Sequence, residues 1–463
     1  MAIASINPAT GEQIKAYPAM GAEQIAQALS LGQQTFMTYR QTSFKQRREW
    51  LHQAAEALLA QKAQLGKLMT LEMGKPVQSA IAEVEKCAWV CRYYADEAEG
   101  FMADEPAETD ASSSYVRFLP LGIILAVMPW NFPLWQVFRA AAPALMAGNT
   151  MLLKHASNVP QSALAIADIF AQAGFPKGAF QTLLIGASQV ESVISDERVK
   201  AVTLTGSGPA GAAVAATAAK HIKKSLLELG GSDPFIVLPS ADVESAIATA
   251  TTARLLNNGQ SCIAAKRFIL VGDVAEPFEA GLAQKFRAQT VGDPLLKETD
   301  IGPLATPSIL QELDQQVQAC IAKGATALVG GDLSALKQQL PDALQGGNFY
   351  PPTILTAIPP GTPADTEEFF GPVALVFRVP DIDSAIALAN STAFGLGASA
   401  WTTDPDEQQQ LIAQLEAGAV FINGLVKSDP RLPFGGIKQS GYGRELGRYG
   451  LIEFVNAKTV WVK

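Results

Sequence analysis

The stretch Ala201-Val202-Thr203-Leu204-Thr205-Gly206-Ser207-Gly208-Pro209-Ala210-Gly211 has the pattern of one strand, one tight turn and the start of one helix. Its first five residues are apolar or β-branched, as in a buried strand, and the glycines and proline that follow are typical of a turn. Similar units lie on both sides, so strands and helices alternate from residue 116 to residue 238. Such alternation predicts a doubly wound parallel sheet.

A second set of alternating elements begins near Phe235–Leu238. It continues through helical stretches at 243–257 and 276–289 to apolar strand-like segments at 374–379 and 418–422. Short apolar runs of this length are typical of strands in a parallel sheet. We therefore expect a second α/β unit, and a chain of 463 residues is long enough for two or three domains.

The N-terminal part and the tail have other patterns. Helical periodicity dominates residues 22–36, 45–65 and 80–100, and a polar, acidic interval at 104–114 is typical of an exposed hairpin or arm. The tail Ile452–Val462 alternates apolar and polar residues, as an edge strand does.

Composition excludes several classes of function. The net charge of −9 and the pI of about 5.1 give no basic surface for nucleic acid or an anionic membrane. Four cysteines without regular spacing and three scattered histidines predict neither a disulfide framework nor a metal site. No apolar stretch reaches the roughly 18 residues that cross a bilayer, and Met1–Pro8 lacks a secretory pattern. We expect a reduced, metal-free enzyme in the cytoplasm.

One cysteine has a setting that suits a nucleophile. Cys262 lies in the small, uncharged segment Asn257–Ala265, and the carboxylate of Glu228 precedes a glycine pair about 30 residues upstream. A thiol nucleophile and its general base would need such access and such a carboxylate. Most free cysteines are instead buried small hydrophobes, and this is the better interpretation for the other three. These are Cys87, Cys91 and Cys320.

The two segments resemble the two signatures of the aldehyde dehydrogenase superfamily, Glu-Leu-Gly-Gly and Gly-Gln-x-Cys. Three further segments, Pro129–Pro133, Glu367–Val373 and Pro433–Gly441, match in the same order, so the resemblance covers essentially the whole chain. It implies that the Cys262 thiolate attacks an aldehyde, that hydride then leaves to a nicotinamide cofactor, and that Glu228 activates the water that hydrolyses the thioester. Family members that pass the acyl group to coenzyme A lack this glutamate, so the implied product is a free acid.

Asn131 follows a predicted strand and precedes a predicted helix. An amide at that place can donate to a developing oxyanion, or it can merely cap the helix. The resemblance implies the first role, with the backbone N–H of Cys262 as the second donor.

The glycines at 206, 208 and 211 allow two interpretations. They form a literal G-x-G-x-x-G, and the Rossmann rule would then assign Glu228, about 20 residues on, to the cofactor ribose. The resemblance instead assigns the phosphate to Ser207 and the role of base to Glu228, and we follow it because Glu-Leu-Gly-Gly is present in full.

The resemblance also implies a cofactor site. Lys154 is expected to contact the adenosine ribose, Glu368 the nicotinamide ribose, and Phe370 the nicotinamide ring. The full set implied is Trp130, Lys154, Ser157, Gly206, Ser207, Leu229, Glu368 and Phe370. Relatives that prefer NAD often carry glutamate where this chain has Ser157, and a glutamate would repel a 2′-phosphate. We expect NADP to be preferred, with NAD also possible.

For the substrate, the segment Trp130–Arg139 and the region of Ser428 resemble those of succinate-semialdehyde dehydrogenases. The implied substrate residues are Arg139, Trp135, Ser261 and Ser428, with Arg139 holding the far carboxylate. Some of these enzymes carry a second arginine six residues before the nucleophile, and here that residue is Leu256. Another small aldehyde therefore stays an alternative.

The resemblance implies two doubly wound α/β domains and a small β arm. A cofactor-binding domain is expected at 1–102 and 121–229, a catalytic domain at 230–441, and an oligomerisation arm with the C-terminal strand at 103–120 and 442–463. The last strand is expected to pair with another subunit of a homodimer or a dimer of dimers. The expected partners are a small aldehyde and copies of this chain.

Two functions of other classes are alternatives. A cofactor-independent cysteine hydrolase would need a histidine beside the thiol, and His52, His155 and His221 lie in segments that do not suggest one. A non-catalytic scaffold on the same fold would not need the set Cys262, Glu228 and Asn131.

Overall fold

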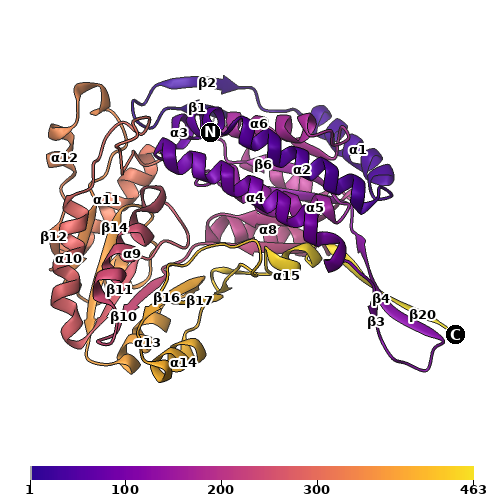
Figure 1. Cartoon of the computed structure of the whole chain (residues 1–463). Coiled ribbons are helices and arrows are strands. Elements are labelled where there is room, and N and C mark those ends of the chain that lie inside the picture. The colour runs from indigo at the N-terminus through magenta and orange to yellow at the C-terminus, as the bar shows by residue number, and fades with distance from the viewer. Residues whose placement is uncertain (1–2) are drawn as a thin grey trace.

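Two large sheets organise the chain, which a computed structural model describes for residues 3–463 (Figure 1). The first sheet has the strand order β19-β9-β8-β5-β6-β7, and its strands are parallel except β19. Its strands are β5 (Ile123–Met128), β6 (Thr150–His155), β7 (Phe180–Thr182), β8 (Val199–Thr205), β9 (Lys224–Glu228) and β19 (Gly441–Tyr442). The predicted doubly wound parallel sheet is confirmed.

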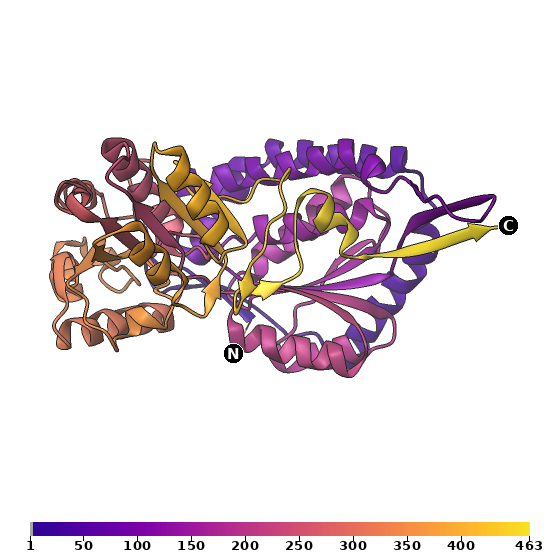
Figure 2. The same cartoon turned by 90° about the horizontal axis from the view of Figure 1, so that it is seen from below.

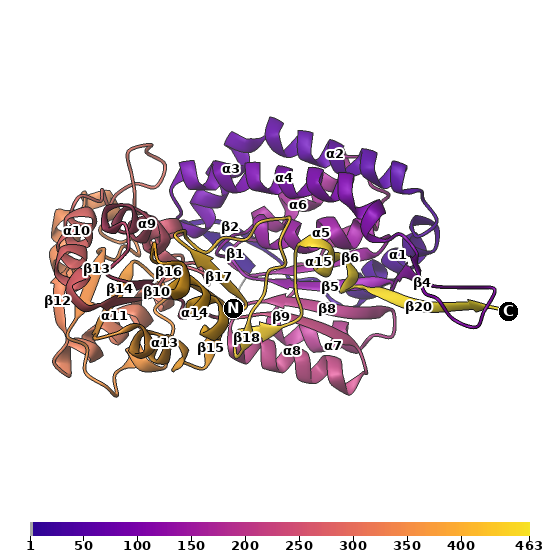
Figure 3. The same ribbon diagram turned by 60° about the horizontal axis from the view of Figure 1, so that its bottom comes forward.

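Helices cover both faces of this sheet (Figure 3). Alternate residues of β5 explain why, because Ile124 and Ala126 pack into one cluster while Ile123 and Leu125 pack into another. One face carries α2 (Phe44–Ala60), α3 (Lys62–Met73), α4 (Val77–Phe101), α5 (Trp135–Met146), α6 (Pro160–Gln172) and α15 (Gly447–Ile452). The other face carries α1 (Ala22–Tyr39), α7 (Val190–Ser195) and α8 (Gly208–Lys220).

The second sheet has the order β12-β13-β14-β11-β10-β16-β17 and is parallel except for β12. Its strands are β10 (Pro234–Val237), β11 (Arg267–Val271), β12 (Thr326–Val329), β13 (Thr353–Thr356), β14 (Val373–Val379), β16 (Gly397–Trp401) and β17 (Ala419–Ile422). Helices α9 (Val243–Leu255) and α10 (Ala275–Arg287) pack on one face. The other face carries α11 (Pro307–Ala322), α13 (Ile382–Asn390) and α14 (Pro405–Gln414). The second α/β unit is therefore also confirmed.

A third sheet forms an arm that projects from the body (Figures 1 and 2). It contains β3 (Glu105–Pro106), β4 (Ser113–Pro120) and β20 (Val455–Val462) in the order β20-β4-β3. The C-terminal strand pairs antiparallel with β4 from Val455 opposite Pro120 to Val462 opposite Ser113. Strand β20 thus has one partner in its own chain and forms an edge of the sheet, so the expected pairing of its other side with another subunit stays a prediction.

Smaller elements complete the fold. They are β1 (Ile3–Ile6) paired with β2 (Gln13–Tyr17), β15 (Phe394–Gly395) paired with β18 (Ile437–Lys438), and α12 (Leu333–Gln339). The single helix expected at 45–65 is two helices, because the backbone leaves helical geometry at Gln61, whose side chain bonds Ala57 and Gln172. Within residues 3–463, no helix has the length and apolar character to cross a membrane.

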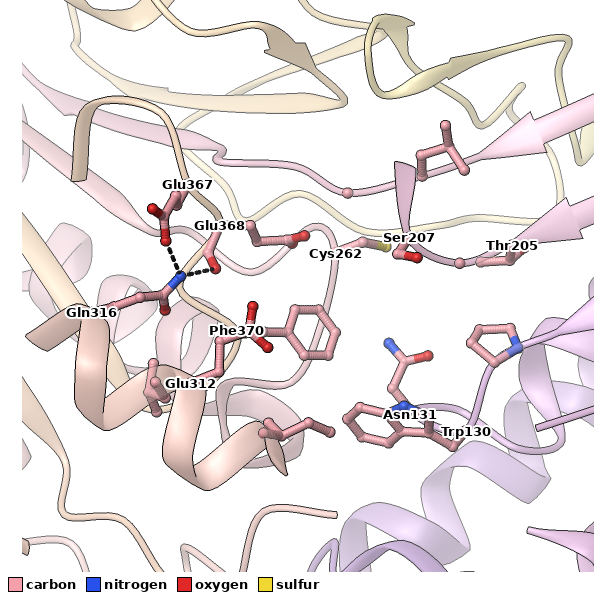
Figure 4. Close-up of a pocket in the computed structure, with 16 residues that line it drawn as sticks. Trp130, Asn131, Thr205, Ser207, Cys262, Glu312, Gln316, Glu367, Glu368 and Phe370 are labelled. Atoms are coloured by element: carbon pink, nitrogen blue, oxygen red, sulfur yellow. Dashed lines mark hydrogen bonds between the residues drawn. The ribbon is translucent and has the colours of Figure 1, made fainter. Parts of the chain in front are cut away.

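Segments of both sheet units come together at one edge of the first sheet. Strands β5, β6, β8 and β9 all end at the carboxyl edge of the first sheet, where open α/β sheets bind ligands. The loops that enter β11 and β14 of the second sheet face this edge (Figure 4). Segments from both units therefore line one region.

Candidate active site

The loop before β11 holds Cys262 in an unusual backbone conformation. A short 3-10 turn, η2 (Leu256–Gly259), contains Asn257 and Asn258 at φ 58° each and Gly259 at φ 73°. Asparagine tolerates the left-handed region better than most residues, and glycine enters it freely. Gly259 is also required by contact, because a Cβ there would lie 2.3 Å from the backbone of Gly371.

Side-chain amides fix this loop to both halves of the molecule. Asn257 Nδ2 donates to the carbonyls of Asn131 at 2.8 Å and Gln260 at 2.9 Å. Asn258 Nδ2 donates to the carbonyls of Gly74 and Pro303, both at 3.0 Å. These two asparagines lie outside the Gly-Gln-x-Cys signature and were not predicted as site residues, although consecutive asparagines before a glycine are a signal for such a turn.

Cys262 lies where two cavities meet. A larger cavity of about 450 Å³ and a smaller one of about 170 Å³ both include Cys262 in their lining. Burial raises the pKa of the thiol to about 12, against the opposing effects of Lys266 and Arg139. Cys262 borders both cavities, but its thiol proton must be removed before the sulfur can act as a strong nucleophile.

Asn131 borders the larger cavity together with Cys262 (Figure 4). It follows β5, its side chain is buried, and its Nδ2 donates to the carbonyl of Gln260 at 3.1 Å. One amide hydrogen is thus committed to the nucleophile loop, which leaves the second hydrogen of Nδ2 for another acceptor. The structure brings Asn131 and Cys262 together as the sequence analysis expected.

Glu228 is not in the lining of either cavity. It ends β9, is 2% exposed, and lies beside Gly435, where an added Cβ would be 2.6 Å from Glu228 Oε1. Burial raises the pKa of Glu228 well above its usual range, Glu445 raises it further, and Arg139 and Arg444 oppose the shift. In this conformation Glu228 and Cys262 do not meet, and a role as base requires the carboxylate to rotate toward the cavity.

Six of the eight expected cofactor residues line the larger cavity. They are Trp130, Gly206, Ser207, Leu229, Glu368 and Phe370. The rings of Trp130 and Phe370 pack edge to face with centroids 5.8 Å apart, and Glu368 pairs with the fully buried Lys266 at 2.9 Å. Ser207 precedes the first turn of α8 and makes no side-chain capping bond, so the helix N-terminus opens onto the cavity.

Lys154 and Ser157 lie outside both cavities, at and just after the end of β6. Lys154 is 9% exposed, burial lowers its pKa, and no carboxylate among residues 3–463 pairs with it. Ser157 is half-buried, and its carbonyl accepts a bond from the backbone N–H of Ala4 at 3.0 Å. A buried cation without an acid is the kind of group that binds an anionic ligand.

Helix α11 contributes residues that the sequence analysis missed. Its side chains Ile309, Glu312, Leu313 and Gln316 line the larger cavity. Gln316 Nε2 donates to Glu367 Oε2 at 2.9 Å and to the carbonyl of Glu368 at 3.3 Å, which orients the segment before β14. A polar side chain on an amphipathic helix gives no sequence signal for such a role.

The four expected substrate residues all line the smaller cavity, namely Trp135, Arg139, Ser261 and Ser428. Arg139, however, is only 2% exposed, and its guanidinium forms an ion pair with Glu445 of the same chain. It also lies 4.7 Å from the ring centroid of Phe434. Its charge is therefore already neutralised. Leu256 lines the same cavity, as does Lys86, which the sequence analysis missed.

The remaining cysteines and the histidines take no part. Cys87, Cys91 and Cys320 are fully buried, which confirms their interpretation as core residues. The three histidines all fall within the described chain and none lines a cavity that contains Cys262. Burial lowers the pKa of His155 to about 4, and His52 pairs with Asp96 at 3.1 Å. No Cys–His nucleophile of a hydrolase is therefore assembled.

Comparisons with known proteins agree with this geometry. Residues 1–460 match the aldehyde dehydrogenase family. A protein of Synechocystis named as a probable succinate-semialdehyde dehydrogenase (NADP(+)) is 60% identical over 462 residues, which is 100% of both chains. Succinate-semialdehyde dehydrogenase (NADP(+)) 1 of Mycobacterium tuberculosis is 53% identical over 465 residues and 100% of both chains. The crystal structure of succinic semialdehyde dehydrogenase from Streptococcus pyogenes, in complex with NADP+, is 36% identical over 99% of both chains, with a TM-score of 0.95.

Proposed function

We infer the reaction from the premise that this chain belongs to the aldehyde dehydrogenase family. We propose that it oxidises succinic semialdehyde to succinate with NADP as the cofactor. One observation carries the proposal, which is that Cys262 lines both the cavity with the expected cofactor residues and the cavity with the expected substrate residues. Two reactants that enter from opposite sides would meet at its sulfur.

Cys262 Sγ forms a bond to the aldehyde carbon, and the carbonyl oxygen becomes an oxyanion. Asn131 Nδ2 and the backbone N–H of Cys262 donate to that oxygen, and such donors act mainly on the charge that develops in the transition state. Burial raises the pKa of the Cys262 thiol, so a base must take its proton before Sγ attacks, and Glu228, once rotated toward the cavity, is the carboxylate that we assign to accept it.

Glu228 serves as the base that activates water in the second step. Burial and Glu445 raise the pKa of Glu228 in its present position, which favours the protonated carboxyl, so Glu228 must leave that position and lose its proton before it can act as a general base. Water attacks the thioester carbon, the C–S bond breaks, and succinate leaves as Cys262 regains its proton. Rotation of Glu228 from its site beside Glu445 toward the cavity is part of this cycle.

The residues present fit NADP. Lys154 is a buried cation that pairs with no carboxylate of residues 3–463, Ser157 adds a hydroxyl just after β6, and the turn at Ser207 offers the first amides of α8 to a phosphate. A Cβ at Gly208 would meet nothing within 4 Å, so the turn leaves space for a ligand. When bound, NADP accepts the hydride that leaves the substrate carbon. The names of the relatives support the same cofactor.

An aldehyde panel tests the proposal. The wild-type protein is mixed with NADP or NAD and each aldehyde, and formation of the reduced cofactor is followed by absorbance. Succinic semialdehyde with NADP should give the highest kcat/KM, and Cys262→Ala should give no turnover. A higher kcat/KM with acetaldehyde or butyraldehyde than with succinic semialdehyde would contradict the substrate assignment.

A further inference from the structure

Lys86 places a cation in the cavity that we assign to the substrate. It lies on α4, its Nζ donates to Ser428 Oγ at 2.8 Å, and it stands 4.1 Å from the ring centroid of Trp135. Cys262, Trp135, Ser428 and Lys86 all line this cavity of about 170 Å³. A group held by Lys86 therefore shares one small enclosure with the nucleophile.

The charge of Lys86 is not neutralised by the protein. The two carboxylates whose charges act on Lys86, Glu83 and Asp429, are both engaged elsewhere. Glu83 pairs with Lys75 and accepts the backbone N–H groups of Leu134 and Trp135, both at 2.9 Å. Asp429 binds Arg431 at 2.7 Å. Within residues 3–463 no carboxylate forms an ion pair with Lys86, and only one of the three hydrogens of its ammonium has an acceptor.

Arg139 differs in this respect. Both cations line the cavity, but Arg139 is paired with the buried Glu445, whereas Lys86 meets a neutral hydroxyl and a ring face. An anion in the cavity gains full ionic contact only from the cation that has no acid already. Lys427 also borders the cavity, but it is exposed and its charge is screened by water.

We propose that Lys86, with the hydroxyl of Ser428, binds the carboxylate of the aldehyde substrate and so determines the preference for ω-carboxylated aldehydes. This inference rests on the proposed function and names the group that recognises the far end of its substrate. Arg139 lines the same cavity, but its charge is paired with Glu445.

The test measures a ratio, kcat/KM for succinic semialdehyde divided by kcat/KM for butyraldehyde, which has a methyl group in place of the carboxylate. Lys86→Met should lower this ratio by about 30-fold or more, because the substrate carboxylate would lose its partner in a desolvated charge pair. Lys86→Arg keeps a cation and should keep most of the ratio. Lys67→Met, an exposed lysine on α3 outside both cavities, is the matched control and should leave it unchanged.

The ratio also has a distinctive pH dependence. Burial, and next to it Arg139, lower the pKa of Lys86 to about 8, while Cys87, Glu83 and Asp429 act in the opposite direction. The ammonium is charged below this pKa, so the wild-type ratio should fall as pH rises through about 8. Titration of Cys262 or Glu228 affects both aldehydes and cancels in the ratio. Lys86→Arg should remove the fall, because guanidinium stays charged.

The outcomes separate this inference from the proposed function. A high wild-type ratio that Lys86→Met does not change would overturn the role of Lys86 and leave the substrate assignment standing. Equal losses for both aldehydes would make Lys86 structural. A wild-type ratio near one, with glutaric semialdehyde also no better than butyraldehyde, would overturn the proposed substrate and the carboxylate site together.

Discussion

The buried ion pair of Arg139 and Glu445 predicts how much stability the protein loses when Arg139 is replaced. Arg139 is 2% and Glu445 3% exposed, and Glu228 lies close enough to Glu445 for their charges to raise the pKa of Glu228. Arg139→Met would leave two buried carboxylates without their main cation. Removing one partner of a buried ion pair costs about 3–5 kcal/mol. For a chain of this length, unfolding as one unit, that corresponds to a drop in Tm of about 3–5 °C.

The pKa of Glu445 determines how the stability loss of Arg139→Met changes with pH. Burial already raises the pKa of Glu445 in the folded protein, and Arg139 opposes that shift. Without Arg139 the folded pKa rises further above the unfolded value, so the folded state holds a proton that the unfolded state releases. Stability then falls as pH rises between the two pKa values. The loss for Arg139→Met should therefore be larger at mildly alkaline than at mildly acidic pH.

Thermal unfolding of wild type, Arg139→Met, Glu445→Gln and the double variant measures this. The double variant should recover part of the Tm lost in Arg139→Met, because a neutral amide needs no counter-ion. A Tm for Arg139→Met within about 1 °C of wild type at both pH values, or a double variant no more stable than Arg139→Met, would refute the reasoning.

Three further predictions concern the site. Asn131→Ala should lower kcat by about 10²–10³-fold, as loss of an oxyanion donor does, and steady-state kinetics at saturating substrate would show a smaller effect if Asn131 only fixes the loop. Ser157→Glu should move the ratio of kcat/KM for NADP over NAD by more than about tenfold toward NAD, since a carboxylate would face the 2′-phosphate, and an unchanged ratio removes Ser157 from cofactor choice. Peroxide should inactivate through Cys262 alone, because Cys262 is partly exposed and lines both cavities whereas Cys87, Cys91 and Cys320 are buried. Peptide mapping that finds Cys262 in a disulfide within the chain would contradict this.

The fold was predictable because apolar strand segments and helical segments alternate along the sequence, and this alternation indicates a parallel sheet. The unit at Ala201–Gly211 forms β8 and α8 as expected, with Ser207 as the residue before the helix. The C-terminal strand was predicted as a strand but not with its partner, because an alternating pattern gives no information about which edge it meets. Its partner β4 lies more than 300 residues earlier in the chain.

Site residues that belong to a sequence motif were predictable, whereas features that depend on contacts between distant segments were not. Asn131 and Cys262 border one cavity, as their motifs imply. The state of a charge depends on its neighbours in space, and the sequence could not show that Glu445 neutralises Arg139 while Lys86 keeps its charge. Nor could it show that Glu228 lies turned away from the cavity, because a side-chain rotamer depends on tertiary contacts.

The proposed mechanism depends on a thioester on Cys262 that is hydrolysed by water activated by Glu228. Mixing Glu228→Gln with NADP and succinic semialdehyde, followed by quenching and peptide mass spectrometry, tests it most directly. We predict one rapid equivalent of NADPH per active site, a slow steady state, and a succinyl group on the peptide that contains Cys262. Turnover at the wild-type rate with no acylated Cys262 would contradict the account.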